Sequence, residues 1–132
     1  MTLKGFRNYK RNIATLLSEF PMLLGTKDNP NVLSVGVLDD IKEHSAIPNY
    51  ILKDVLNVWC SRIEYHRSMV SKGAFRWIDY SGVKPVLRVG KLPQSRKVWA
   101  WSQLGKRALN NPNVVVKYEL YKLDNPLEQP RW

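Results

Sequence analysis

Basic and aromatic side chains are concentrated in one stretch of this chain. Residues 80–118 contain eight Lys and Arg and no Asp or Glu, so this stretch carries most of the formal net charge of +10. Four aromatic residues are interleaved with the cations: Tyr80, Trp99, Trp101 and Tyr118. Cations can neutralise phosphates and flat rings can stack on bases, so the combination predicts a surface that binds nucleic acid. A solvated basic face, with the tryptophans in the core, is the alternative.

The sequence supports an enzymatic function less well than a nucleic-acid-binding one. Asp39, Asp40 and Glu43 could hold a divalent metal in a small nuclease, but a solvated helix surface that includes Lys42 explains them equally well. We find no nucleophile paired with a base and no phosphate-cradling glycine loop. One Cys and two His cannot build the usual zinc sites. We therefore expect no enzymatic activity, no metal and no cofactor.

Size and composition are those of one domain. The chain has 132 residues, of which 44% are hydrophobic, and its sequence pI of about 9.9 suits a polyanionic partner or an acidic membrane surface. The single Cys60 excludes an intramolecular disulfide and fits a reducing compartment. The basic N-terminus lacks the unbroken apolar run of a signal peptide, and no window reaches the ~18 apolar residues of a membrane span. We expect a cytoplasmic monomer with no membrane partner.

Apolar spacing predicts helices in the first half of the chain. Residues 6–19 form an amphipathic pattern that ends before Pro21, with a basic stripe of Lys4, Arg7 and Arg11 on the opposite side. Two interpretations of this stripe remain open: it is solvated surface, or it contacts phosphates. Residues 22–32 have loop composition, and residues 33–41 predict a short buried helix or turn. A longer helix begins after Pro48 and breaks near Cys60, where Ser61 and Glu64 have capping-box spacing; it restarts as a second helix through about Val70.

The second half of the chain predicts a hairpin followed by a helix. Residues 75–79 and 83–89 flank a Ser-Gly turn, and Pro85 limits the second arm to a sheet edge. Residues 94–109 predict an amphipathic helix, residues 114–123 alternate as a strand does, and residues 124–132 predict a frayed tail. The expected fold is α+β, a mainly helical single domain over residues 1–123 with a small β-hairpin or sheet.

Several separate motifs, in order, resemble the FinO/ProQ family of bacterial RNA chaperones over about residues 8–109. The matching residues are Phe20-Pro21, the segment Leu33 to Ile41 (LSVGVLDDI), Leu52 to Leu56, Tyr65, Gly73-Ala-Phe-Arg76 and Gly82. The chain departs from the family pattern in a longer, more basic stretch from Val83 to Pro93, and in Trp59 where the family often has a tyrosine. The strand-like tail has no counterpart that we can assign.

The resemblance implies a domain that binds RNA stem-loops with a single-stranded 3′ tail, as in terminators, and assists pairing of regulatory RNA with its target. Family members hold the terminal nucleotide in a pocket, whose residues here would be Tyr65 and Arg76, with Asp40 near them and Lys53 on the main helix. A helix N-terminus and basic side chains would hold duplex phosphates. Nearness in sequence to this pocket motif adds as phosphate candidates Arg62, Lys72, Lys84, Arg88 and Lys91.

These roles are chemically reasonable. Side chains cannot read the deep major groove of an RNA duplex, so recognition falls on phosphates, 2′-hydroxyls and unpaired ends. Arg76 can make a forked contact to a phosphate, and Tyr65 can stack or donate a hydrogen bond. Asp40 could accept from a sugar hydroxyl or orient Arg76. The alternative for Tyr65 is a core ring with its hydroxyl at the surface, and the alternative function is a DNA-binding transcriptional regulator of winged-helix type.

Overall fold

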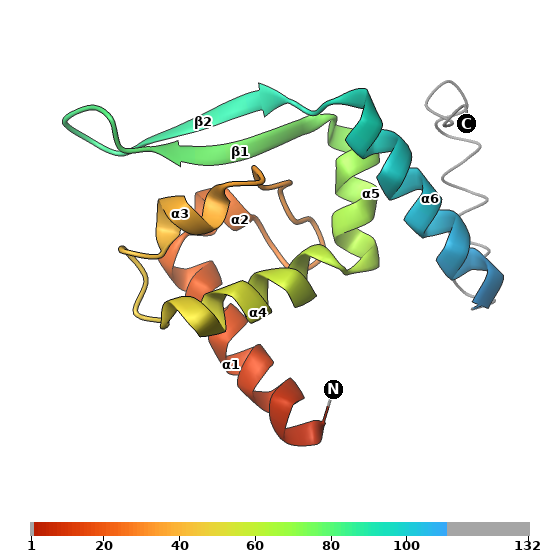
Figure 1. The fold of residues 1–132 in the computed structure, drawn as a ribbon, viewed down its shortest axis with the longest axis horizontal. Helices are drawn as coiled ribbons and strands as arrows, with labels where there is room; N and C mark the ends of the chain where they lie inside the picture. Colours follow the sequence, from red (N-terminus) through yellow and green to blue (C-terminus); the bar gives the residue numbers. More distant parts are fainter. Residues whose placement is uncertain (1, 111–132) are drawn as a thin grey trace.

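Six helices and one hairpin make up the part of the chain that the structure describes, which is residues 2–110 of a computed structural model (Figure 1). In order the elements are α1 (Leu3–Glu19), α2 (Pro21–Leu24), α3 (Val37–Ile41), α4 (Asn49–Cys60), α5 (Ile63–Lys72), β1 (Ala74–Asp79), β2 (Val86–Lys91) and α6 (Gln94–Asn110). The predicted mainly helical α+β fold is confirmed. The strand predicted over residues 114–123 and the tail over 124–132 lie outside the described residues.

Local signals set the ends of α1. The hydroxyl of Thr2 accepts a hydrogen bond from the Gly5 N–H at 3.0 Å, which caps the helix one turn earlier than the apolar pattern indicated. Ile13 and Leu16 are buried, and the helix stops before Pro21 as predicted. Pro21 then starts the single turn of α2, so the predicted loop is partly helical at its beginning.

The predicted break between α4 and α5 is present, but its cap is different. Arg62 is the N-cap residue of α5, and it makes no side-chain capping bond. Ser61 still has helical backbone angles, so its hydroxyl donates to the Asn57 carbonyl at 2.6 Å rather than capping the next helix. Glu64 pairs with Arg62 at 3.4 Å. The capping box is therefore wrong, because Ser61 belongs to the end of α4.

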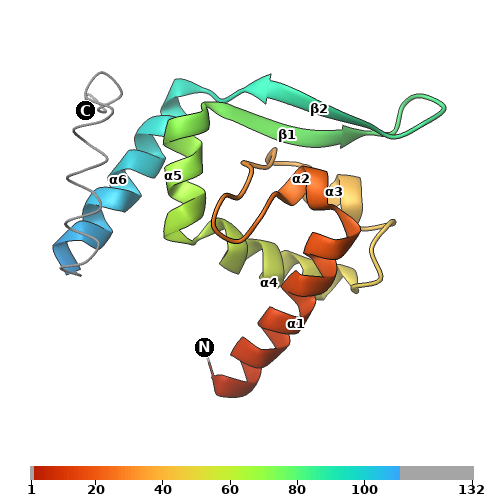
Figure 2. The same ribbon diagram turned by 180° about the vertical axis from the view of Figure 1, so that it is seen from behind.

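The core lies between the hairpin and the helices. In Figures 1 and 2 the helices α2 and α3 lie beneath β1, α4 crosses below them, and α5 and α6 run side by side at one end. The largest fully buried side chains include Leu16 from α1, Leu52 and Trp59 from α4, and Met69 from α5. Each buried side chain of this size contributes about 1.5–3 kcal/mol by leaving water. No helix within residues 2–110 is long and apolar enough to cross a membrane.

The hairpin connects α5 to α6 along the chain. Gly73 ends α5 with a φ of +58°, a left-handed conformation that turns the chain into β1 and favours glycine. β1 and β2 pair antiparallel, with Trp77 opposite Arg88, and β2 begins after Pro85. The other edge of β1 holds residues 32–34, because the Arg76 N–H donates to the Val32 carbonyl at 2.8 Å and the Arg76 carbonyl accepts from Ser34 at 3.0 Å. This pairing fixes the 32–34 segment beside α5.

Candidate nucleic-acid interface

A cavity of about 310 Å³ opens between the segment 33–38 and helices α4, α5 and α6. Its volume is at the lower end of the range for small-molecule sites, about 300 Å³ and above. Leu33, Leu56 and Met69 contribute apolar surface to it. The polar, charged and aromatic side chains that line it are Ser34, Lys53, Asn57, Cys60, Tyr65, Arg96 and Trp99.

Tyr65 shapes this cavity from within the core. Its side chain is 2% exposed, and its hydroxyl accepts a hydrogen bond from the Leu33 N–H at 2.9 Å. Burial raises the pKa of Tyr65, so the hydroxyl is neutral at physiological pH. Burial also raises the pKa of the Cys60 thiol, which a hydrogen bond with Tyr65 partly offsets. Tyr65 is thus a core ring, and its hydroxyl holds the 33–38 segment instead of reaching the surface.

Two cations reach the cavity from different helices. Lys53 and Asn57 are four residues apart on α4 and share one helix face, and Arg96 and Trp99 are three apart on α6 and share another. Trp99 is 51% exposed, and its ring meets the ring of His66 edge-on at 5.2 Å between centroids. The cavity therefore combines positive charge from two sides with an accessible aromatic ring.

Three of the predicted phosphate ligands contact backbone carbonyls of α2 or of the loop between α2 and α3 instead. Each cation donates to a backbone carbonyl of residues 22–30, at 2.7–2.9 Å. The pairs are Arg62 with Lys27, Lys72 with Pro30, and Arg76 with Met22. Burial and the neighbouring charge of Arg76 lower the pKa of Lys72, in that order of importance. We call Arg62, Lys72 and Arg76 the loop cations, since Arg62 and Lys72 donate to carbonyls of the loop and Arg76 donates to the Met22 carbonyl in the short helix before it.

Asp40 lies against the hairpin. Burial raises the pKa of Asp40, a hydrogen bond with the Ile78 backbone lowers it, and the charges of Asp39 and Asp79 raise it further. Neither Asp40 nor Arg76 is among the residues that line the cavity. Of the four residues that the family resemblance brought together, the cavity contains Tyr65 and Lys53 only. The RNA-binding roles of all four stay predictions.

The hairpin carries the remaining predicted cations, Lys84, Arg88 and Lys91, all of which are exposed. Arg88 forms an ion pair with Asp79. Hydrogen bonds from Ser81, followed by the bond from Arg88, lower the pKa of Asp79 to about 2.

The rings in the basic stretch have different environments. The Tyr80 ring stacks on His44, with centroids 4.2 Å apart. Trp101 is buried in the core, so it offers no surface for a base, whereas Trp99 is accessible. Tyr118 lies outside the described residues.

The acidic side chains do not gather into a metal site. Asp39 pairs with Lys42 at 3.1 Å, and Asp40 interacts with β1 as described above. Over residues 2–110 there is no group of three or more His, Cys, Asp or Glu that could hold a metal ion.

Sequence reasoning missed Ser34 and Asn57, and it named Arg96 and Trp99 only as part of the basic stretch, without assigning them to the pocket. Two helix-spacing signals were present: Asn57 follows Lys53 by one turn, and Arg96 precedes Trp99 by three residues on a helix that was predicted correctly. Spacing places side chains on a common face of a helix, but it does not indicate which face another helix will approach. The packing of α6 beside α5 brings Arg96 and Trp99 to the cavity.

A cation-lined cavity in a small, strongly basic domain is typical of proteins that bind nucleic acid. The profile of the ProQ/FINO family matches residues 6–105, and the chain belongs to this family. ProQ/FINO proteins bind RNA and include RNA chaperones, which favours RNA over the DNA that a winged-helix regulator would bind. No curated protein and no solved structure matches the chain.

Proposed function

We propose that this protein binds RNA stem-loops with a single-stranded 3′ tail, and that it acts as a chaperone in post-transcriptional regulation by small or antisense RNA. The cavity takes the end of the tail. The proposal depends mainly on one observation: Lys53 from α4 and Arg96 from α6 both line the same cavity of about 310 Å³.

The side chains around the cavity suit the parts of a terminal nucleotide. Lys53 and Arg96 can bind the phosphates on the 5′ sides of the last two sugars by charge-assisted hydrogen bonds. The Asn57 amide offers both a donor and an acceptor to a base edge or a sugar hydroxyl. Trp99, exposed at the cavity, can stack on a base. Tyr65 contributes indirectly, by holding Leu33 in place.

The start of α4 is the proposed contact for the duplex. This helix begins at Asn49 with no side-chain cap, so its first N–H groups can donate to a phosphate. Asn49 and Asn57 are separated by about 12 Å along the helix axis, given a rise of about 1.5 Å per residue. A stem docked at the start of α4 would therefore have its tail directed along the helix toward the cavity.

The loop cations keep a smaller proposed part in RNA binding. A guanidinium has five N–H donors, so the bond from Arg76 to Met22 leaves donors that can reach a phosphate. Arg62 is less available, because its side chain is 17% exposed and its Nη1 atom is buried. Because these side chains are oriented by the loop carbonyls, we expect them to add to general affinity for the duplex and not to recognise the RNA end.

Three RNAs test the proposal: a hairpin with a 3′ tail, the hairpin without its tail, and the tailed hairpin with a 3′-phosphate that blocks the terminal hydroxyl. Fluorescence anisotropy should show the strongest binding for the first RNA. Affinity should fall with salt, by a log-log slope of up to about −0.7 per phosphate contact in the tail. Equal affinity for all three RNAs would contradict recognition of the end. Preference for a duplex DNA of defined sequence would instead support a transcriptional regulator.

A further inference from the structure

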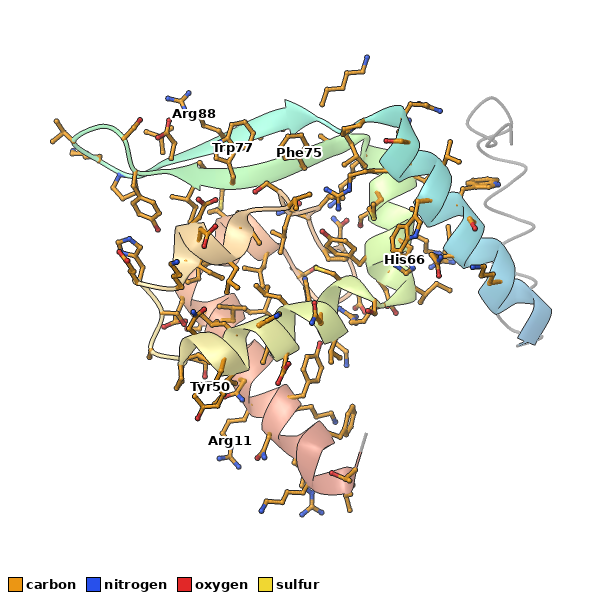
Figure 3. All side chains as sticks on the ribbon, viewed as in Figure 1. Arg11, Tyr50, His66, Phe75, Trp77 and Arg88 are labelled. Atoms are coloured by element: carbon orange, nitrogen blue, oxygen red, sulfur yellow. The ribbon has the colours of Figure 1, made fainter. Side chains whose placement is uncertain are left out.

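Two aromatic rings lie together on the hairpin, apart from the proposed site for the RNA end. Phe75 and Trp77 are two residues apart on β1 and so point to the same face of the sheet. Their rings stack with centroids 5.3 Å apart and an interplanar angle of 27°. Figure 3 shows the two rings next to each other along the hairpin, with Arg88 beyond Trp77. Both side chains are partly exposed, and we call this pair the ring platform.

The strand opposite the ring platform is shaped to accommodate it. Gly90 pairs with Phe75 in the hairpin register. A Cβ atom at Gly90 would lie 2.8 Å from a Phe75 ring atom and 3.1 Å from a Trp77 ring atom, so any other residue there would require the rings to shift. Both rings therefore lean across β2 over the glycine. This arrangement covers the strand with aromatic surface, instead of leaving the rings to stand upright as separate side chains.

The opposite face of the hairpin is used for packing. Ile78 and Leu87 are partly buried against the hydrophobic core, and the Arg76 side chain on that face bonds to Met22. Phe75 also contacts the edge of the core, which anchors its ring, whereas Trp77 is not among the side chains packed against the core. The ring platform thus has one anchored ring and one ring that extends along the hairpin toward its turn.

The surroundings of the ring platform are positively charged. Arg88 is opposite Trp77 in the register and its side chain is 52% exposed. The nearby carboxylate of Asp79 is already paired with Arg88 and Ser81. Lys84 precedes β2 and is exposed, whereas Lys91 pairs with Ala74 and so lies on the other face of the hairpin. An apolar pair of rings among cations is complementary to a chain of bases and phosphates.

We infer that the ring platform binds a single-stranded stretch of RNA, separate from the tail, by stacking one or two bases on Trp77 and Phe75 while Arg88, on the same face of the hairpin, contacts a phosphate. This inference rests on the proposal that the protein binds RNA. It adds a second contact that the cavity does not include. The RNA partner is favoured over an acidic peptide because a peptide would use the cations but would not require two stacked rings.

The test uses a tailed hairpin RNA with and without a single-stranded 5′ extension of adenines. In the natural protein the extension should strengthen binding by about 5- to 150-fold, the range expected for stacking of one base on a ring. The double variant Phe75→Leu/Trp77→Leu keeps apolar cover over Gly90 and should lose this gain while binding the unextended RNA as before. Val89→Ala, an exposed apolar residue on the other face of β2, is the matched control.

The outcomes separate this inference from the proposed function. Lys53→Ala/Arg96→Ala should weaken binding of both RNAs and leave the gain from the extension unchanged. If the extension adds nothing in the natural protein, the ring platform is not an RNA contact, even where recognition of the tail holds. If the double variant lowers the melting temperature but keeps the gain, the rings only shield Gly90 and the inference is overturned. Photocrosslinking of a 4-thiouridine in the extension should label the peptide that contains Phe75 and Trp77.

Discussion

Two groups of cations in this domain differ in what they contact. The loop cations Arg62, Lys72 and Arg76 donate to backbone carbonyls of residues 22–30. The cavity cations Lys53 and Arg96 instead line a cavity of about 310 Å³. The residue types are the same, and all five positions are in or near the predicted pocket motif or the basic stretch. The difference teaches that positive charge near a motif does not identify a phosphate ligand until the local carbonyls have been accounted for.

This division has an energetic reason. A loop that crosses between α2 and α3 has carbonyls with no helix or sheet partner, and a long cationic side chain can satisfy them at the protein surface. Beside the cavity, the backbone of residues 32–34 is already paired with β1 through Arg76. We therefore expect the loop cations to matter mainly for stability and the cavity cations mainly for binding.

The largest expected effect is on the cavity cations. Lys53→Ala/Arg96→Ala should weaken binding of tailed hairpin RNA by about 100-fold or more, because each charge-assisted hydrogen bond contributes about 1.5–3 kcal/mol. The melting temperature should change little. Lys27→Ala, which removes one charge from an exposed loop position, is the control and should have a much smaller effect. Unchanged affinity of the double variant would contradict the assignment of the cavity.

The next largest effect is expected for the hydrogen bond between Tyr65 and Leu33, which holds one wall of the cavity. Tyr65→Phe removes the acceptor of the buried Leu33 N–H, and a buried donor without a partner costs about 1–3 kcal/mol. The free energy of unfolding in urea should fall by this amount. Binding of the tailed RNA should also weaken, because the segment 33–38 is held less firmly. A variant as stable as the natural protein would show that Leu33 finds another acceptor.

A smaller effect is expected for the loop cations. Arg76→Ala should lower stability by about 1 kcal/mol, since its bond to Met22 is exposed to solvent. Its effect on RNA affinity should be weaker than that of the cavity double variant, and Arg76→Lys should restore part of the stability. The opposite result, a large loss of affinity in an equally stable protein, would support the pocket inferred from the family resemblance and contradict the division between the two groups.

The smallest effect concerns the hairpin ion pair between Arg88 and Asp79. The pKa of Asp79 is lowered from 3.8 to about 2 in the folded protein, so its stabilising contribution is present above 3.8 and is lost as the pH falls toward 2. Asp79→Asn should therefore be slightly less stable than the natural protein at neutral pH, and the difference should vanish in acid. Thermal unfolding followed by circular dichroism over this pH range tests it, and a difference independent of pH would contradict it.

Much of the fold could be predicted because it depends on local signals. Pro21, Pro48 and Gly73 punctuate the chain at helix ends, and the Ser81-Gly82 turn separates two strand patterns. The Ser61 capping box failed because the same spacing fits a hydroxyl that bonds back to Asn57 at the end of α4. The one turn of α2 was missed because four residues are too few for an apolar period to be visible.

The candidate site was only partly predictable. Tyr65 and Lys53 came from the family resemblance, and the structure places both at the cavity. Arg76 points to the face of β1 on which its side chain reaches Met22. The strand register decides this orientation, and the distance between Arg76 and Tyr65 in the sequence does not indicate it. Arg96 was counted in the basic stretch but not assigned to the pocket, because its partner Lys53 is far away along the chain.

The amino-acid sequence by itself determined the family, the helical character, the position of the hairpin and the excess of positive charge, since each depends on composition or on neighbours within a few residues. Only the tertiary structure decided which cations are used by the loop carbonyls, which tryptophan is accessible and where a cavity opens. These three features depend on how α4, α5, α6 and β1 pack against one another. That packing decides which side chains, distant in sequence, reach a given carbonyl or line a given cavity.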